Sequence, residues 1–152
     1  MTDGACIFRL TLRSHYEMLD FVQLVSDRLG VIAGLDEDAQ HWLGVAVRET
    51  VVNAIKHGNR HDQNKLVVVE FSFTPAEVPN RLTISVRDQG EGFEPAAVAD
   101  PLAPENLLKS SGRGIFFMRS FMDDVVLRRL PEGGMEVRLV KNLSDPPAFA
   151  AR

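Results

Sequence analysis

The chain has 152 residues, of which 45% are hydrophobic and one is cysteine, and its formal net charge is −4. This composition fits one compact domain and excludes general disorder, an internal disulfide and a cysteine-rich zinc site. No basic run, signal-peptide pattern or membrane-length apolar run is present, so we expect a cytoplasmic protein without direct nucleic-acid or membrane contact.

The first part of the chain predicts one strand and two helices. Residues 7–12 alternate apolar and other side chains, as a strand does. Ser14 and Glu17 have the spacing of a capping box and should open a helix that fades near residues 30–34. The acidic residues 36–38 favour the start of a second helix, which Gly58 should end. Its core-facing stripe is predicted to be Ala39, Trp42, Leu43, Ala46 and Ile55.

The second part of the chain is mostly strand-like. "KLVVVEFSF" and "RLTISVRD" predict two strands joined by a turn over 75–80. Residues 89–111 are rich in glycine, proline and serine and predict a long loop, of a length that is usually functional. A helix over 114–122 and a hairpin of "VVLRRL" and "MEVRLV" should follow. Residues 144–152 are predicted to be a disordered tail.

This order of elements indicates the fold class. Consecutive strands joined by tight turns favour a mostly antiparallel, mixed sheet, and the helices should cover one of its faces. We therefore predict a two-layer α+β sandwich formed by a single domain over residues 1–143.

Asp88 stands out because it ends the second of these strands in phase with Leu82, Ile84 and Val86. A carboxylate on this helix-facing side would cost several kcal/mol if it had no partner. The strand end must therefore be wet or receive a hydrogen bond. Gly90 and Gly92 follow, and glycines allow a sharp turn and the close approach of a flat ligand. Taken alone, such a D-x-G-x-G is more often a plain turn.

A second pair of glycines, Gly112 and Gly114, directly precedes the helix predicted over 114–122. Such a turn presents unpaired N–H groups at the positive end of the helix dipole, which favours phosphate. A flexible hinge with a helix cap is an equally good explanation of this segment alone. The pattern is neither a P-loop nor a dinucleotide fingerprint.

Glu49, Asn53 and His57 are spaced four residues apart and share one stripe of the second helix. The neutral oxygen of Asn53 suits magnesium, which keeps several waters and takes few protein ligands. Glu49 could accept a proton from a hydroxyl or orient a water. His57 is expected to cap the helix end. His57 and His61 are also four apart, but no third ligand is evident, which argues against a metal pair.

The order of these motifs resembles the Bergerat ATP-binding domain shared by gyrase, heat-shock chaperones, histidine kinases and mismatch-repair proteins. It is most similar to bacterial anti-sigma-factor serine kinases. "RETVVNAIKHGN" resembles their N box, and "VRDQGEGFEP" their first glycine box. "DPLAPENLLKSSGRGIFFMRSFMDDV" resembles their lid, second glycine box and following strand. The likeness extends over nearly the whole chain.

The resemblance implies a role for each matching residue. Asn53 would bind the magnesium held by the ATP phosphates, and Glu49 would be the general base. Asp88 would accept from the adenine amino group. Four glycines would shape the rest of the site: Gly90 and Gly92 beside adenine, Gly112 and Gly114 around the phosphates. The loop 93–111 would be the lid.

The chain departs from the family pattern at two places. Met135 stands where relatives often carry a threonine that helps hold the aspartate, so the hydrogen bonding of Asp88 is expected to be thinner. Ser110 stands where relatives can carry an arginine, so Lys109 or Arg113 would supply the cation for the phosphates.

The resemblance implies a kinase that uses Mg-ATP to phosphorylate a serine of a STAS-type anti-anti-sigma protein. Such a protein also sequesters a sigma factor and commonly forms a homodimer. Two other functions use the same residues. One is a nucleotide-dependent binding switch without kinase activity, and the other is a slow ATPase in which Glu49 orients water.

Overall fold

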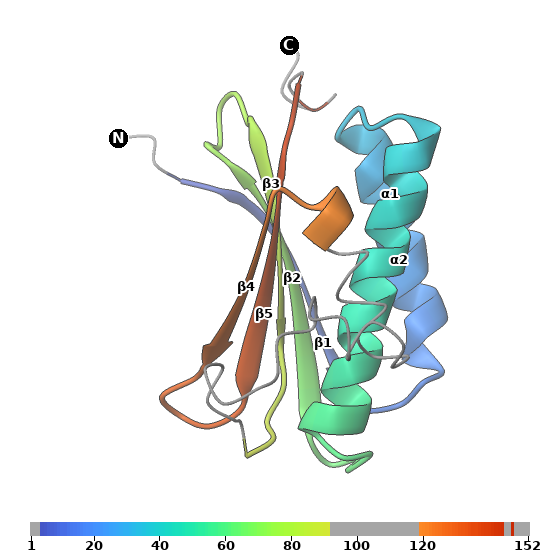
Figure 1. Ribbon diagram of the computed structural model, residues 1–152, viewed down its shortest axis with the longest axis vertical. Coiled ribbons are helices and arrows are strands. Elements are labelled where there is room, and N and C mark those ends of the chain that lie inside the picture. Colours follow the sequence, from blue (N-terminus) through green and yellow to red (C-terminus); the bar gives the residue numbers. More distant parts are fainter. Residues whose placement is uncertain (1–3, 92–118, 145–146, 148–152) are drawn as a thin grey trace.

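The computed structural model describes residues 4–91, 119–144 and 147. In chain order, its elements are β1 (Cys6–Arg13), α1 (Met18–Ile32), α2 (Glu37–Asn53), the π-helix η1 (Ala54–Gly58), β2 (Leu66–Thr74), β3 (Arg81–Arg87), β4 (Asp124–Arg129) and β5 (Met135–Asn142) (Figure 1). A short helical stretch, 119–121, precedes β4.

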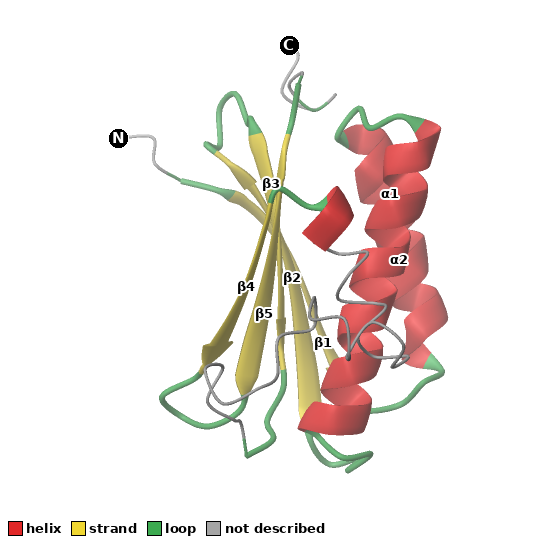
Figure 2. Ribbon diagram, in the orientation of Figure 1, coloured by secondary structure: helices red, strands yellow, loops and turns green. Residues whose placement is uncertain are grey.

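The strands form one 5-stranded sheet in the order β1-β2-β3-β5-β4. All four pairings are antiparallel, so the described strands form an antiparallel sheet and not the mixed one expected from the sequence. Both long helices lie on the same side of this sheet, and none of the helices in the described part of the chain covers its other face (Figure 2). The predicted two-layer α+β sandwich is therefore confirmed.

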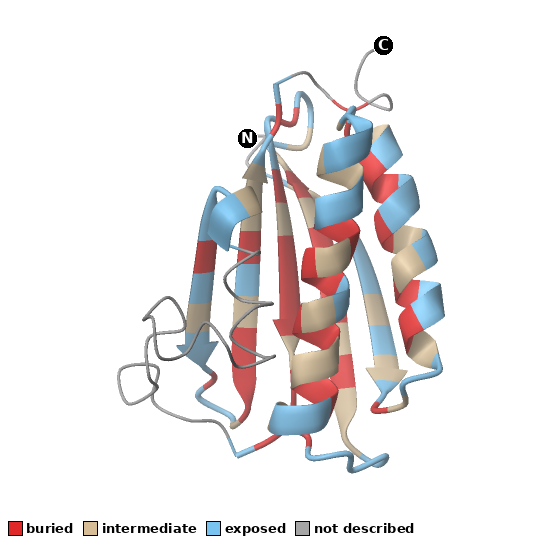
Figure 3. Cartoon of the chain, turned by 45° about the vertical axis from the view of Figure 1, so that its right-hand side comes forward, coloured by how far each residue is buried: buried red, intermediate tan, exposed pale blue. Residues whose placement is uncertain are grey.

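The hydrophobic core lies between the sheet and the two long helices, α1 and α2. Alternate residues of the central strands point into it, as the two-residue period of a strand requires. Figure 3 shows that buried residues recur along the central strands and along both helices. Leu43, Ala46 and Ile55 are buried as predicted, but Trp42 is 36% exposed and contacts the ring of His41 edge-on. Trp42 was therefore wrongly placed in the core-facing stripe.

The two long helices begin in different ways. Asp36 caps α2, because its side chain accepts a hydrogen bond from the Ala39 N–H at 2.8 Å. The capping box predicted for α1 is wrong. Ser14 Oγ donates instead to the Lys65 carbonyl at 2.8 Å, and α1 starts at Met18 without a side-chain cap. Ser14 thus ties the end of β1 to the segment before β2.

The predicted hairpin is confirmed: β4 and β5 pair across a turn in which Gly133 and Gly134 have positive φ. Leu143, just after β5, donates its N–H to the Asn80 carbonyl and closes the core. The lid 93–111, the first part of the helix predicted over 114–122 and most of the tail 144–152 lie outside the described residues. Among the described helices, none is long and apolar enough to cross a membrane.

Candidate functional site

Asp88 lies directly after β3, on the helix-facing side of the sheet, and is 8% exposed. Its Oδ1 accepts two backbone hydrogen bonds, from the Gly90 N–H at 2.9 Å and from the Met135 N–H at 3.2 Å. Its own N–H donates to the Met135 carbonyl at 3.0 Å. The predicted burial is confirmed, and the donors are backbone groups of the following turn and of β5.

Met135 donates to Asp88 through its backbone N–H, which a residue of any type other than proline provides. A threonine at this position would offer a hydroxyl as well, so the thinner hydrogen bonding expected around Asp88 stays a prediction. The methionine side chain itself is buried.

Desolvation by burial raises the pKa of the Asp88 carboxyl. The two backbone hydrogen bonds and the charge of Lys65 act in the opposite direction but do not cancel it. The ionised form of such a carboxylate is stabilised when a ligand supplies a further hydrogen-bond donor, because this donor offsets part of the desolvation cost.

The last turn of the second helix lies against Asp88. A Cβ added at Gly58 would overlap Asp88 Oδ2, and one added at Gly90 would overlap the Gly58 carbonyl oxygen. Glycine at both positions therefore lets the helix end and the turn after β3 meet backbone to backbone. The two segments come together at the lower end of the molecule in Figure 1.

The helix ends as η1, in which the Asn59 N–H donates to the Ala54 carbonyl at 2.7 Å, a spacing of five residues. Gly58 ends the helix as predicted. Asn59 keeps a right-handed conformation, and the left-handed residues are Arg60 and His61. Short π-helices occur frequently at functional sites. His57 is exposed in this last turn, and its capping role stays a prediction.

Glu49 and Asn53 both lie on α2, one turn apart, and each is partly buried. Desolvation raises the pKa of the Glu49 carboxyl, and the charge of Lys56 opposes this shift. Asn53 is the last residue of α2 before η1 begins. The helix that carries the predicted base and metal ligand is thus the one whose end contacts Asp88.

The other predicted site residues cannot be placed. Gly92, Lys109, Gly112, Arg113 and Gly114 lie outside the described residues, as does Ser110. In the part of the chain that is described, no group of three or more His, Cys, Asp or Glu side chains could hold a metal ion. His61 instead contacts the Tyr16 hydroxyl through its Nε2 at 2.7 Å.

Sequence reasoning missed Asn59, which is 1% exposed. Its amide bonds to three separate segments: the Gln89 N–H, the Leu66 carbonyl and the Ser14 hydroxyl. The only signal in the sequence is its position, directly after the glycine that ends the helix.

The face of the sheet that no described helix covers carries a separate polar cluster. Glu136 is 1% exposed and accepts hydrogen bonds from Arg87 at 2.6 Å and Ser85 at 3.0 Å, with Arg128 and Arg138 also in contact. Burial alone would raise the pKa of this carboxyl, but the hydrogen bonds and the arginine charges lower it.

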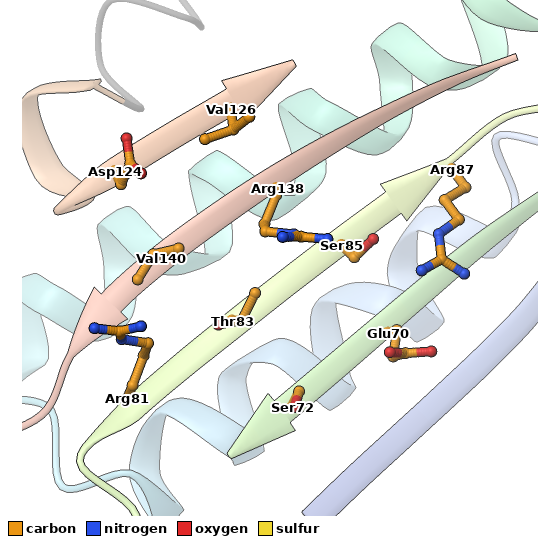
Figure 4. A pocket seen from close by; sticks show the side chains of 10 residues that line it. All are labelled: Glu70, Ser72, Arg81, Thr83, Ser85, Arg87, Asp124, Val126, Arg138 and Val140. Atoms are coloured by element: carbon orange, nitrogen blue, oxygen red, sulfur yellow. The ribbon is translucent and has the colours of Figure 1, made fainter. Parts of the chain in front are cut away.

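A groove of about 380 Å³ lies on the same face, and Figure 4 shows its lining side chains in front of the strands, with the helices behind. The groove is lined by Glu70, Ser72, Arg81, Thr83, Ser85, Arg87, Asp124, Val126, Arg138 and Val140. None of them is a predicted site residue. The groove is therefore separate from the site at Asp88.

Comparison with known proteins identifies the family. Residues 12–141 match the histidine kinase-like ATPase domain. The chain is 27% identical to "Serine-protein kinase RsbW" of Staphylococcus epidermidis over 138 residues, which cover 87% of this chain and 84% of the relative. It is 34% identical to "Anti-sigma F factor" of Clostridium perfringens over 119 residues, covering 74% and 81%. The protein of that name from Bacillus velezensis is 36% identical over 124 residues, covering 78% and 81%. The chain therefore belongs to the histidine kinase-like ATPase family, in its branch of anti-sigma-factor serine kinases.

Proposed function

We propose that this protein is a serine kinase that uses Mg-ATP to phosphorylate a STAS-type anti-anti-sigma protein, and that it sequesters a sigma factor. The observation that carries the proposal is the contact between the end of the α2–η1 helix and Asp88. The helix that carries Glu49 and Asn53 adjoins the segment that carries Asp88, which supports the proposal. The names of the relatives, a serine-protein kinase and anti-sigma factors, support the same function.

Asp88 would recognise adenine. Its Oδ1 already accepts two backbone N–H groups, whereas Oδ2 lies against Gly58. The exocyclic amino group of adenine would donate to this carboxylate and offset its burial. A 6-oxo purine presents an acceptor at the same place and would be rejected, because two acceptors would face each other.

Asn53 would hold the magnesium ion. Its side chain offers a neutral oxygen from a partly buried position on the same helix as Glu49, and magnesium commonly takes few protein oxygens alongside phosphates and waters. Magnesium, when bound, would neutralise phosphate charge during transfer. Lys109 or Arg113, with Gly112 and Gly114, would complete the phosphate contacts.

Glu49 would act as the general base. It takes the proton of the substrate serine hydroxyl while the serine oxygen bonds to the γ-phosphorus of ATP and the bond to the β-phosphate oxygen breaks, releasing ADP. A base works best when its pKa lies near the working pH. Burial moves the pKa of Glu49 in that direction.

Phosphoryl transfer is tested with labelled ATP, magnesium and candidate STAS-type proteins. The kinase proposal predicts label on a partner serine, with transfer lost in Glu49→Gln. Nucleotide binding without any transfer would favour a nucleotide-dependent switch, and phosphate release without an acceptor protein would favour a slow ATPase. Sedimentation of the purified protein would test the homodimer that the family resemblance implies.

A further inference from the structure

Asn59 holds a position that the proposed chemistry does not explain. It is 1% exposed and lies directly after η1. Its Oδ1 accepts the Gln89 N–H at 2.7 Å. Its Nδ2 donates to the Leu66 carbonyl at 3.0 Å and to Ser14 Oγ at 2.8 Å. Both amide protons and the amide oxygen are therefore used.

These partners fix the orientation of the amide. Oδ1 must face Gln89, because a backbone N–H can only donate, and Nδ2 must face Leu66, because a carbonyl can only accept. A buried amide with every group satisfied is rigid, and losing one of its partners is costly. The Asn59 side chain is thus a fixed link from the helix end to the residue after Asp88.

The link acts on the turn that holds the Asp88 carboxylate. Gln89 lies between Asp88 and Gly90, and the Gly90 N–H is one of the two donors to Asp88 Oδ1. The Gln89 side chain adds a second tie, because its Oε1 accepts the Leu66 N–H at 2.8 Å. The turn is therefore held from both sides, by Asn59 and by the start of β2.

We propose that Asn59 is a positioning residue for the nucleotide base: by holding the Gln89 N–H, it sets where the Asp88 carboxylate meets the adenine amino group. This inference rests on the proposed role of Asp88 as the adenine acceptor. As a positioning residue, Asn59 would touch neither the nucleotide nor the serine substrate. It acts only through the turn from Asp88 to Gly90.

The test is the ratio of dissociation constants for ATP and ITP, which differ at the 6-position of the purine. The proposal predicts that wild type prefers ATP and that Asn59→Ala loses about tenfold or more of this preference. A merely structural role would reduce the folded fraction, and this reduction would weaken both nucleotides equally. The ratio therefore separates positioning from stability.

Two further variants sharpen the test. Ser14→Ala removes one partner of Nδ2 but leaves the bond to Gln89, so it should lower the melting temperature and keep the ATP preference. Asn59→Asp keeps an acceptor for the Gln89 N–H and loses the donor to Leu66. At a pH where the introduced carboxylate and that of Asp88 are both ionised, this variant should be less stable than wild type. It should nevertheless recover most of the preference for ATP over ITP that Asn59→Ala loses. If Asn59→Ala is unfolded in buffer, the titrations are repeated in trimethylamine N-oxide, which favours the compact state.

The outcomes separate two failures. Equal binding of ATP and ITP by the wild-type protein would overturn the role of Asp88 and the inference with it. A wild-type preference that stays unchanged in Asn59→Ala would overturn the positioning role alone. Loss of the preference in Ser14→Ala, or in Asn59→Asp as fully as in Asn59→Ala, would also overturn it, because both variants keep the link to Gln89.

Discussion

Replacing Asp88 with asparagine should change stability and nucleotide binding in opposite directions. The carboxylate is 8% exposed, and its Oδ1 accepts the N–H groups of Gly90 and Met135. The amide oxygen of asparagine can accept the same two hydrogen bonds. The substitution therefore keeps the local geometry and removes a buried charge.

Without nucleotide, we expect Asp88→Asn to raise the free energy of unfolding by about 1 kcal/mol, because the charged form no longer has to be desolvated. For a chain of this size, that gain corresponds to a rise in melting temperature of about 2–4 °C. A stabilising substitution at a binding residue is the usual sign that the native residue is kept for function.

The gain should depend on pH with a definite sign. The folded state raises the pKa of Asp88 above its ordinary 3.8. Between the unfolded-state and folded-state pKa values of Asp88, the folded protein therefore binds more protons than the unfolded one. Wild-type stability falls as the pH rises through this range. The asparagine side chain does not titrate, so it adds no such pH dependence. The advantage of the variant should be complete above the folded-state pKa of Asp88 and should shrink as the pH is lowered through that pKa toward 3.8.

ATP binding should fall in the same variant, because an amide N–H₂ would face the adenine amino group and two donors cannot pair. Losing a charge-assisted hydrogen bond of about 1.5–3 kcal/mol weakens binding by about 10-fold to 150-fold. Thermal unfolding with and without ATP measures both effects in one assay. Asp62→Asn is the matched control, because Asp62 is exposed and also accepts a backbone N–H, from Asn64. A less stable Asp88→Asn that still binds ATP like wild type would refute the reasoning.

Three further predictions follow from the same geometry. Glu49→Gln should keep the ATP dissociation constant and lower serine phosphorylation by about 10²-fold to 10⁴-fold. In the wild type, the transfer rate should fall as the pH drops through the raised pKa of Glu49, a decline that the variant lacks; an unchanged rate would exclude Glu49 as the base. Gly58→Ala should lower the free energy of unfolding by about 1–3 kcal/mol and weaken ATP binding, because the added Cβ displaces the Asp88 carboxylate. The control Gly30→Ala, whose Cβ meets only ordinary contacts, should change neither quantity when both are measured by calorimetry. Glu136→Gln should cost about 1.5–3 kcal/mol at neutral pH by chemical denaturation. Since folding lowers the pKa of Glu136, its contribution to stability is present above the ordinary pKa of 4.5 and is lost as the pH falls through the folded-state pKa. A variant as stable as wild type at neutral pH would contradict this account.

The sequence alone predicts the layers and the position of Asp88, because both follow from periodicity. Strict alternation in β2 and β3 fixes which side chains face the helices, and Asp88 continues that alternation one step beyond β3. The apolar stripe of α2 predicts less well which side chains face the core. A helix face is wider than a strand face, and the position of Trp42 at its edge depends on how the helix is rotated against the sheet.

The contacts that complete the site depend on tertiary structure. Asn59 forms hydrogen bonds to Ser14, Leu66 and Gln89, which are far apart from one another in the sequence. No local sequence pattern can therefore predict this role of Asn59. The capping-box prediction for Ser14 failed because its hydroxyl donates instead to the Lys65 carbonyl, in the segment before the neighbouring strand β2.

The arginine cluster around Glu136 illustrates the role of strand register. Its members come from β3, β4 and β5, and they meet only because Arg87, Glu136 and Arg128 are paired across the sheet. The order of β5 between β3 and β4 cannot be read from local sequence. In the sequence, Glu136 looks like an ordinary exposed strand residue.

The most direct test of the central claim is a thermal-unfolding titration of the wild-type protein with ATP, ADP and magnesium. A ligand that binds only the folded state stabilises it by about 2.7 kcal/mol at a hundredfold excess over its dissociation constant. We predict a rise in melting temperature that grows with ATP concentration and is larger with magnesium. An unchanged melting temperature at millimolar Mg-ATP would contradict the account of this protein as a nucleotide-dependent kinase.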